Sequence, residues 1–220
     1  MLWNEIRFVG FDTETSGPDP RTAEIVSACV GEREWLLQPT APIPAAATSV
    51  HGITTEHATR HGVPHAAGIA EIRDAIQALW AERGALCVFN ASYDCTVLDR
   101  ECQRHGLGRF EVRGVIVDPY VVDKEIDRFR RGKRQLLDVA RHYGVPLSAD
   151  AAHGARADAI AAAQLAAHLA PNLPSPERAN AAQARSHKAQ KESYAGWLER
   201  QGRADAAREV RANTEWPIRS

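Results

Sequence analysis

The sequence predicts an α/β fold in which a mixed five-stranded sheet carries helices on both faces. Strand-like apolar runs occur at residues 6–11, 24–30, 33–37, 85–89 and 115–117. Helical apolar periodicity occurs at residues 65–82, 92–105, 135–143 and 155–169. Three leading strands followed by alternating helices and strands are typical of a mixed sheet with helices packed on each side.

Local signals justify these elements in turn. Gly31-Glu32 between the second and third runs indicates a tight hairpin. The helix over 65–82 places Ile69, Ile72 and Ile76 on one stripe. Residues 85–89 are continuously apolar, as expected for a strand covered on both faces.

A compositional change divides the chain into two predicted parts. Residues 1–172 form the α/β domain, and residues 173–220 form a charged helical C-terminal extension that follows a Pro-Ser-Pro segment. We favour packing of this extension on the domain through Trp197 and Trp216. A polymerase-binding arm and a nucleic-acid grip are the alternatives.

Bulk properties limit the class of protein. The chain has 220 residues, with 27 basic and 28 acidic side chains, so binding to a polyanion must rely on local clusters. There is no apolar stretch of about 18 residues and no signal-peptide pattern, so we expect no membrane association. The cysteines form no CxxC pair, which favours reduced thiols in a cytoplasmic protein.

Two carboxylates end the first apolar run. Asp12 and Glu14 are two residues apart, so on a strand they point to the same side and can bind one divalent ion. The alternative is that they begin the surface turn at residues 16–20. These residues alone do not decide between the two.

Two further acidic elements follow at predicted helix starts. Asn90 suits the turn after the fourth strand, and it places Asp94 in the first turn of the next helix. His153 and Asp158 lie at the start of the Ala-rich helix. Each Asp alone is explained by the helix dipole. Together with Asp12 and Glu14, however, these acids can converge on one edge of the sheet.

These segments, in this order, resemble the DEDDh 3′–5′ exonucleases, of the type of the DNA polymerase III epsilon proofreading subunit, over roughly residues 5–170. The matching segments are Asp12-Thr13-Glu14-Thr15, Asn90 to Asp94, His153 to Asp158, Val50-His51-Gly52-Ile53-Thr54 and Gly132 to Asp138. Phe89 stands where many members have His, and Tyr93 where Phe is frequent. The resemblance implies an RNase H-like fold and 3′–5′ exonuclease activity.

The resemblance also implies a catalytic site with two divalent metal ions. Its metal ligands are Asp12, Glu14, Asp94 and Asp158, and His153 is the general base that takes a proton from water. Ligands that are all oxygen atoms favour the hard ions Mg²⁺ or Mn²⁺ over zinc. Asp118 is left with a structural role.

The predicted substrate contacts are Thr15, His51, Asn90 and Tyr93. For His51 and Tyr93, packing is the alternative. The basic run at residues 128–134 suits a phosphate backbone, although most such runs are solvated surface. His57, His61 and His65 are expected to be exposed histidines, because no further ligand completes a zinc set.

The resulting hypothesis is an enzyme that releases nucleoside 5′-monophosphates from single-stranded 3′ ends, with DNA favoured as substrate by the resemblance. An exoribonuclease that trims short RNA is one alternative. The other is a non-catalytic, polymerase-associated module that binds nucleic acid. That module predicts loss of at least one of the five catalytic residues, and all are present. A DNA polymerase is a further candidate partner, with proofreading or DNA repair as the setting.

Overall fold

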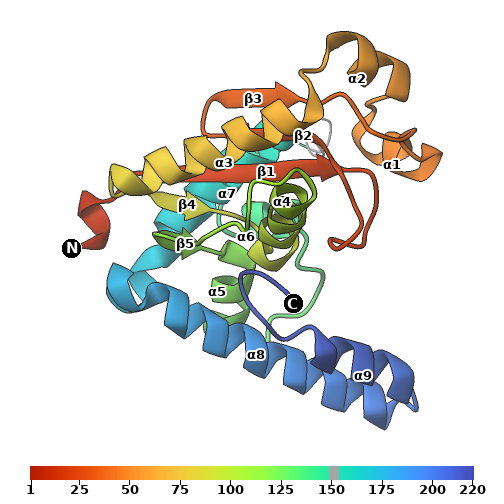
Figure 1. Ribbon diagram of the computed structural model, residues 1–220. Coiled ribbons are helices and arrows are strands. Elements are labelled where there is room, and N and C mark those ends of the chain that lie inside the picture. The colour runs from red at the N-terminus through yellow and green to blue at the C-terminus, as the bar shows by residue number, and fades with distance from the viewer. Residues whose placement is uncertain (149–153) are drawn as a thin grey trace.

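The structure is a computed structural model that describes residues 1–148 and 154–220 (Figure 1). His153, the predicted general base, therefore lies outside the described residues. No helix within these two ranges is both long enough and apolar enough to span a membrane.

A five-stranded mixed sheet forms the centre, as predicted. Its strands lie in the order β3 (Arg33–Leu36), β2 (Ile25–Val30), β1 (Phe8–Thr15), β4 (Ala85–Cys87) and β5 (Val115–Val117). The pairs β1/β2 and β2/β3 are antiparallel, and β1/β4 and β4/β5 are parallel. β1 extends to Thr15, so Asp12 and Glu14 lie within the strand, opposite Cys29 and Ser27 of β2.

Helices cover both faces of this sheet. The main ones are α3 (His65–Ala81), α4 (Ala91–Arg104), α6 (Leu136–His142) and α7 (Ala155–Leu169). α7 crosses one face, while α3 and α4 cover the other (Figure 1). The larger core lies under α3 and α4, where Phe11, Ile72 and Leu86 are fully buried.

Three helices were not predicted. They are α1 (Ala45–His51), α2 (Thr55–His61) and α5 (Pro119–Ile126), and two short 3₁₀ turns, η1 (Trp3–Glu5) and η2 (Ala170–Asn172), complete the domain. α5 had a readable signal, because Asp118 caps it by accepting from the N–H of Tyr120 and Pro119 occupies its first position.

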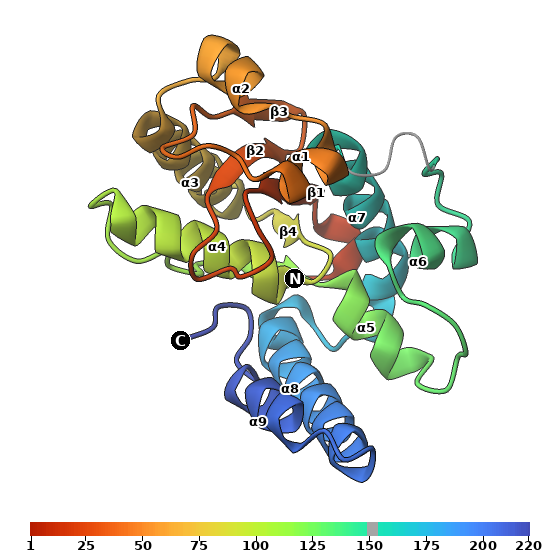
Figure 2. The same ribbon diagram turned by 90° about the vertical axis from the view of Figure 1, so that its right-hand side faces the viewer.

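The C-terminal extension consists of α8 (Pro176–Arg200), α9 (Ala204–Ala212) and a tail to Ser220. α8 runs beside β5 and α5, and the tail returns between α4 and α8 (Figure 2). Trp216 packs against the main core, as predicted, whereas the prediction for Trp197 is wrong because 43% of that residue is exposed. The division at residues 172/173 stays a prediction.

Amide side chains of α8 close the open edge of β5. Asn180 Oδ1 accepts from the Ile116 N–H at 2.9 Å. Gln183 Nε2 donates to the Ile116 carbonyl at 2.7 Å, and its Oε1 accepts from the Asp118 N–H at 2.7 Å. Edge strands with unpaired backbone groups invite wrong pairing, and these amides occupy those groups.

Replacing the buried Gln183 with Leu is expected to lower the free energy of unfolding by about 3 kcal/mol. The substitution leaves the Ile116 carbonyl and the Asp118 N–H buried without partners, and each such group costs about 1–3 kcal/mol. Urea unfolding followed by circular dichroism measures the change. The exposed Gln164→Leu on α7 is the matched control, and an equal loss in both variants would contradict the bridging role.

Candidate active site

The site begins with Asp12 and Glu14 on β1, which share one face of the strand. Burial raises the pKa of Asp12 well above its usual range, and the charges of Asp94, Asp158 and Glu14 raise it further. Burial, followed by the charges of Asp158 and Asp94, raises the pKa of Glu14 to about 8. These carboxylates are therefore close enough to repel one another strongly.

α7 brings the third carboxylate to this point. Asp158 lies in the first turn of α7, and its carboxylate oxygen lies within 4.8 Å of those of Asp12 and Glu14. α7 can approach β1 so closely because Gly10 has no side chain; a Cβ there would lie 1.8 Å from the Ala159 carbonyl oxygen. The predicted convergence of these three acids is therefore present in the structure.

Asp94 lies beside this group and is held in a different way. It is 4% exposed, and its Oδ1 accepts hydrogen bonds from the Thr13 N–H at 3.1 Å and the Thr13 hydroxyl at 2.6 Å. Burial raises the pKa of Asp94 to about 7, although the hydrogen bonds from Thr13 oppose the shift. Among the described residues, the acidic group whose carboxylate oxygens all lie within 4.8 Å of one another consists of Asp12, Glu14 and Asp158. Asp94 is not part of that group.

The turn that presents Asp94 depends on Asp118. Asn90 adopts a positive φ of 67°, and its N–H and that of Ala91 donate to the two Asp118 oxygens at 2.9 Å each. Trp216 Nε1 donates to the same carboxylate at 3.1 Å. Asp118 therefore has the structural role expected from the resemblance. Asn90 serves as the residue before α4, and its predicted contact with substrate stays a prediction.

Three of the predicted substrate residues line one pocket. A cavity of about 420 Å³ beside Glu14 is lined by Thr15, His51 and Tyr93, together with apolar residues of α1. The hydroxyls of Thr15 and Tyr93 lie 2.5 Å apart, and the Tyr93 hydroxyl also donates to the Gly17 carbonyl. Burial lowers the pKa of His51, which favours a neutral ring in this pocket.

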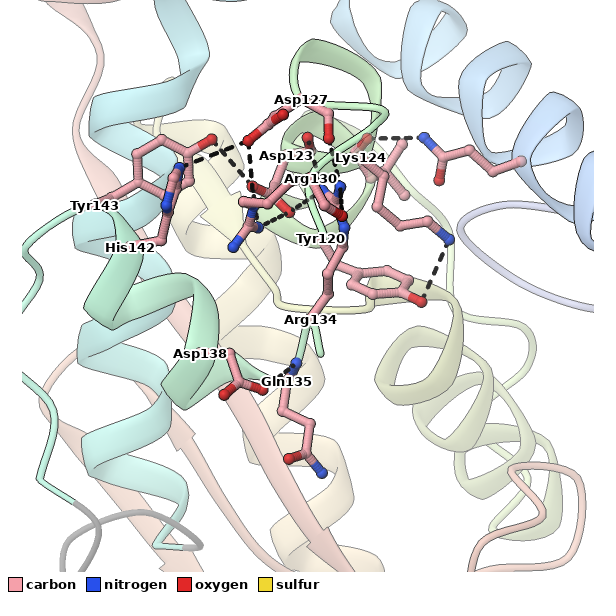
Figure 3. A network of polar contacts seen from close by, with 12 residues as sticks. Tyr120, Asp123, Lys124, Asp127, Arg130, Arg134, Gln135, Asp138, His142 and Tyr143 are labelled. Carbon is pink, nitrogen blue, oxygen red and sulfur yellow. Dashed lines mark hydrogen bonds and ion pairs between the residues drawn. The ribbon is translucent and has the colours of Figure 1, made fainter. Parts of the chain in front are cut away.

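The basic run at residues 128–134 is only partly available to a ligand. Arg130 and Arg134 bind the buried Asp123 carboxylate at 2.6 and 2.7 Å, and their side chains are 14% and 12% exposed (Figure 3). The Tyr143 hydroxyl donates to the same carboxylate at 3.0 Å. The prediction that this whole run contacts phosphate is therefore wrong for Arg130 and Arg134, which stabilise the α5–α6 connection. Phe129 is 89% exposed.

His65 is buried, which contradicts the prediction of three exposed histidines. Its Nδ1 lies 2.9 Å from the Gln38 carbonyl, and its Nε2 contacts the buried Glu101 carboxylate. His105 brings a third possible ligand within 4.8 Å of these two groups. However, Arg104 Nε also donates to Glu101 at 2.7 Å, so the carboxylate already has cationic partners. We assign the group to an ion pair.

This ion pair is expected to make stability depend on pH. Burial lowers the pKa of His65, but the hydrogen bond and charge of Glu101 outweigh burial and raise it overall. Burial raises the pKa of Glu101, but the hydrogen bond and charge of His65, together with the charge of Arg104 and the hydrogen bond from the Ile25 N–H, lower it overall. The pair therefore stabilises the fold below the unfolded histidine pKa of about 6.5, and the contribution is lost as pH rises through the folded value.

His65→Gln should consequently cost about 3 kcal/mol of unfolding free energy near pH 6. The penalty should shrink as the pH is raised toward 9, because the wild-type ring loses its proton as pH rises through its raised folded pKa. Urea unfolding of both proteins at the two pH values measures the difference. A penalty that does not change with pH would show that His65 acts through packing alone. His57→Gln, at an exposed position of α2, is the control.

Comparisons with known proteins identify relatives of this chain. The family model described as Exonuclease (RNase_T) matches residues 9–166. The chain is 33% identical over 171 residues to uncharacterized exonuclease CP81 of Escherichia phage 186, covering 71% of this chain and 84% of the relative. It is 31% identical over 183 residues to a DNA polymerase III subunit epsilon-like protein of Rhodobacter capsulatus, covering 77% of this chain and 24% of the relative.

Solved structures agree on the fold. Escherichia coli Exonuclease I in complex with a dT13 oligonucleotide matches with a TM-score of 0.58 and 19% identity. The match covers 75% of this chain and 42% of that protein, so the chain spans less than half of Exonuclease I. The family model covers well over half of this chain, so the chain belongs to the exonuclease family, and the prediction that it is an exonuclease is confirmed.

Proposed function

We propose that the chain removes nucleotides one at a time from the 3′ end of single-stranded DNA, in a reaction that uses two divalent cations. The observation that supports this most strongly is the convergence of Asp12, Glu14 and Asp158 within 4.8 Å at the sheet. Like charges so close together are unfavourable unless a cation lies among them.

The donor set fits the proposed cations. Carboxylate oxygens of Asp12, Glu14 and Asp158, with Asp94 beside them, are ligands that Mg²⁺ and Mn²⁺ prefer. When bound, such ions activate a water molecule and stabilise negative charge on the phosphate and on the departing oxygen. One Asp94 oxygen is already held by Thr13, which fixes the carboxylate beside Asp12.

The chain's own residues position the terminal nucleotide and remove a proton from the attacking water. The pocket formed by Thr15, His51 and Tyr93 adjoins Glu14, so a terminal nucleotide bound there would place its phosphate at the carboxylates. We assign His153 the role of general base, which removes the proton of the attacking water. Water then forms the new P–O bond, the bond from phosphorus to the 3′ oxygen of the preceding nucleotide breaks, and a nucleoside 5′-monophosphate leaves.

Digestion of end-labelled substrates tests this function. Single-stranded DNA, matched single-stranded RNA and mismatched duplex are each incubated with Mg²⁺ and with Mn²⁺, and products are resolved by length. Release of 5′-mononucleotides from the 3′ end of DNA is expected. Faster cleavage of RNA would favour the exoribonuclease, and binding without cleavage would favour the non-catalytic module.

His153→Gln tests the general base separately. Turnover should fall most near neutral pH, because an imidazole with a pKa of about 6.5 is an effective base there. The measurement is the pH profile of kcat for wild type and variant. An unchanged profile would remove His153 from this role.

A DNA polymerase remains a proposed partner. The support is the likeness to a protein named for DNA polymerase III subunit epsilon, of which this chain covers 24%. Co-elution of the chain with a replicative polymerase in gel filtration tests it, and separate elution would favour a nuclease that acts alone.

A further inference from the structure

A groove between α5 and α8 lies outside the carboxylate site. Its cavity of about 350 Å³ is lined by Lys124, Glu125 and Arg128 on one side and by Gln190, Tyr194 and Trp197 of α8 on the other. Gln190 Nε2 donates to the Val121 carbonyl at 2.9 Å, which fixes α8 against α5. The groove thus has a defined shape made by segments far apart in the sequence.

Two aromatic rings of this groove face solvent. Tyr194 and Trp197 are 48% and 43% exposed, and their rings stack with centroids 5.8 Å apart and planes 12° apart. Neither ring belongs to the apolar cluster formed by α8 and α9 in the described chain. Exposed aromatic faces beside cations are typical of surfaces on which bases of a single strand stack.

Lys124 lines the groove, and two further cations, Lys191 and Arg219, lie outside its lining. Lys124 lies over the Tyr120 ring at 4.7 Å, and the half-buried Lys191 follows Gln190 on α8. Burial lowers the pKa of Lys191, and the charges of Arg219 and Lys124 lower it further, so the three cations lie near one another. Within residues 1–148 and 154–220, none of the three forms an ion pair with a carboxylate. Glu125, the acidic residue of the groove lining, pairs instead with Arg128 at 3.4 Å, so these three cations can pair with an anionic ligand.

The C-terminal tail connects this cluster with the active site. Arg219 Nη2 donates to the Ser92 hydroxyl at 3.0 Å, and the Arg219 N–H donates to the Thr96 hydroxyl at 2.9 Å. Ser92 precedes Tyr93, which lines the pocket beside Glu14. Figure 2 shows that this tail lies between α4 and α8.

We propose that the groove between α5 and α8 binds the part of the single-stranded DNA that precedes its 3′-terminal nucleotide. Bases stack on Tyr194 and Trp197, and phosphates contact Lys124, Lys191 and Arg219. The C-terminal extension is thus a substrate-binding element. This inference rests on the proposed function, because that function places the 3′ end at the carboxylates.

Equilibrium binding tests the groove without cleavage. The ligand is a fluorescent, nuclease-resistant phosphorothioate oligothymidylate of about 16 nucleotides, the upper site size of common single-strand folds. Lys191→Met should weaken binding about tenfold and reduce the slope of log K against log salt by about 0.7, the value for one phosphate contact. Trp197→Leu should weaken binding about tenfold through lost stacking. Lys188→Met, an exposed lysine of the same helix, is the control.

Three results separate the possible outcomes. Lys191→Arg should restore affinity and salt slope, and the melting temperature of free Lys191→Met should equal or exceed that of wild type because repulsion is relieved. If both Lys191→Met and Trp197→Leu kept the wild-type affinity and salt slope, the proposal that this groove binds DNA would be wrong, whatever the nuclease activity. Groove-dependent binding by a wild-type chain that releases no nucleotide from ordinary DNA would instead overturn the proposed function.

Discussion

Asp12→Asn is expected to reduce nucleotide release by about 10³-fold or more. Asp12 lies at the centre of the site, where the charges of Asp94, Asp158 and Glu14 all act on it. Asn keeps the shape of the side chain but removes the charge that would hold cations beside the phosphate. Release of mononucleotides from 3′-labelled DNA measures the loss, and a rate within tenfold of wild type would remove Asp12 from the catalytic set.

The same substitution should stabilise the protein when no divalent ion is present. The pKa of Asp12 is raised in the folded state, so the folded chain holds the proton more tightly than the unfolded chain. Ionisation at neutral pH therefore costs stability, and Asn avoids that cost. Thermal unfolding with EDTA should show a higher melting temperature for Asp12→Asn, and added Mg²⁺ or Mn²⁺ should raise the wild type alone. A lower melting temperature in EDTA would indicate that Asp12 is needed for folding.

The carboxylate site was largely predictable because its geometry follows from local rules. Asp12 and Glu14 share a face through the two-residue period of a strand. Asp94 and Asp158 lie in first turns of helices, where acidic side chains are favoured. The strand runs and the hairpin at Gly31 likewise specified most of the sheet.

Other features depend on contacts that the sequence pattern does not contain. β1 continues to Thr15 because Glu14 pairs with Ser27 of β2, and that register is set by two distant segments. The sequence reveals the high charge density of residues 128–134. It does not reveal that the buried Asp123 binds Arg130 and Arg134. Burial of His65 depends on Glu101. Ion pairs between residues distant in the sequence therefore determine which arginines and histidines remain exposed to a ligand.

Gly10→Ala is expected to damage both stability and activity, although Gly10 carries no chemistry. Its new Cβ would lie 1.8 Å from the Ala159 oxygen and 2.4 Å from the Ala159 carbonyl carbon. Both are backbone atoms of α7, so no side-chain rotation relieves the clash and the helix itself must shift. Overpacking of this kind costs about 1–3 kcal/mol of unfolding free energy.

The shift would be felt directly at the carboxylates. Asp158 precedes Ala159 on α7, so it moves away from Asp12 and Glu14 with the helix. A misplacement of about 1 Å can reduce turnover about 10²-fold. We therefore expect kcat on single-stranded DNA to fall by about that factor in the fraction of Gly10→Ala that remains folded.

Gly196→Ala on α8 separates this clash from the general effect of replacing glycine. The nearest atom to a Cβ there is Arg200 Nη1 at 3.5 Å, which is ordinary contact, and alanine in a helix is favoured by about 0.5–1 kcal/mol. Gly196→Ala should therefore raise the free energy of unfolding measured in urea, whereas Gly10→Ala lowers it. The kcat of Gly196→Ala should remain near that of wild type. Wild-type stability and turnover in Gly10→Ala would mean that the close approach of α7 to β1 does not position Asp158.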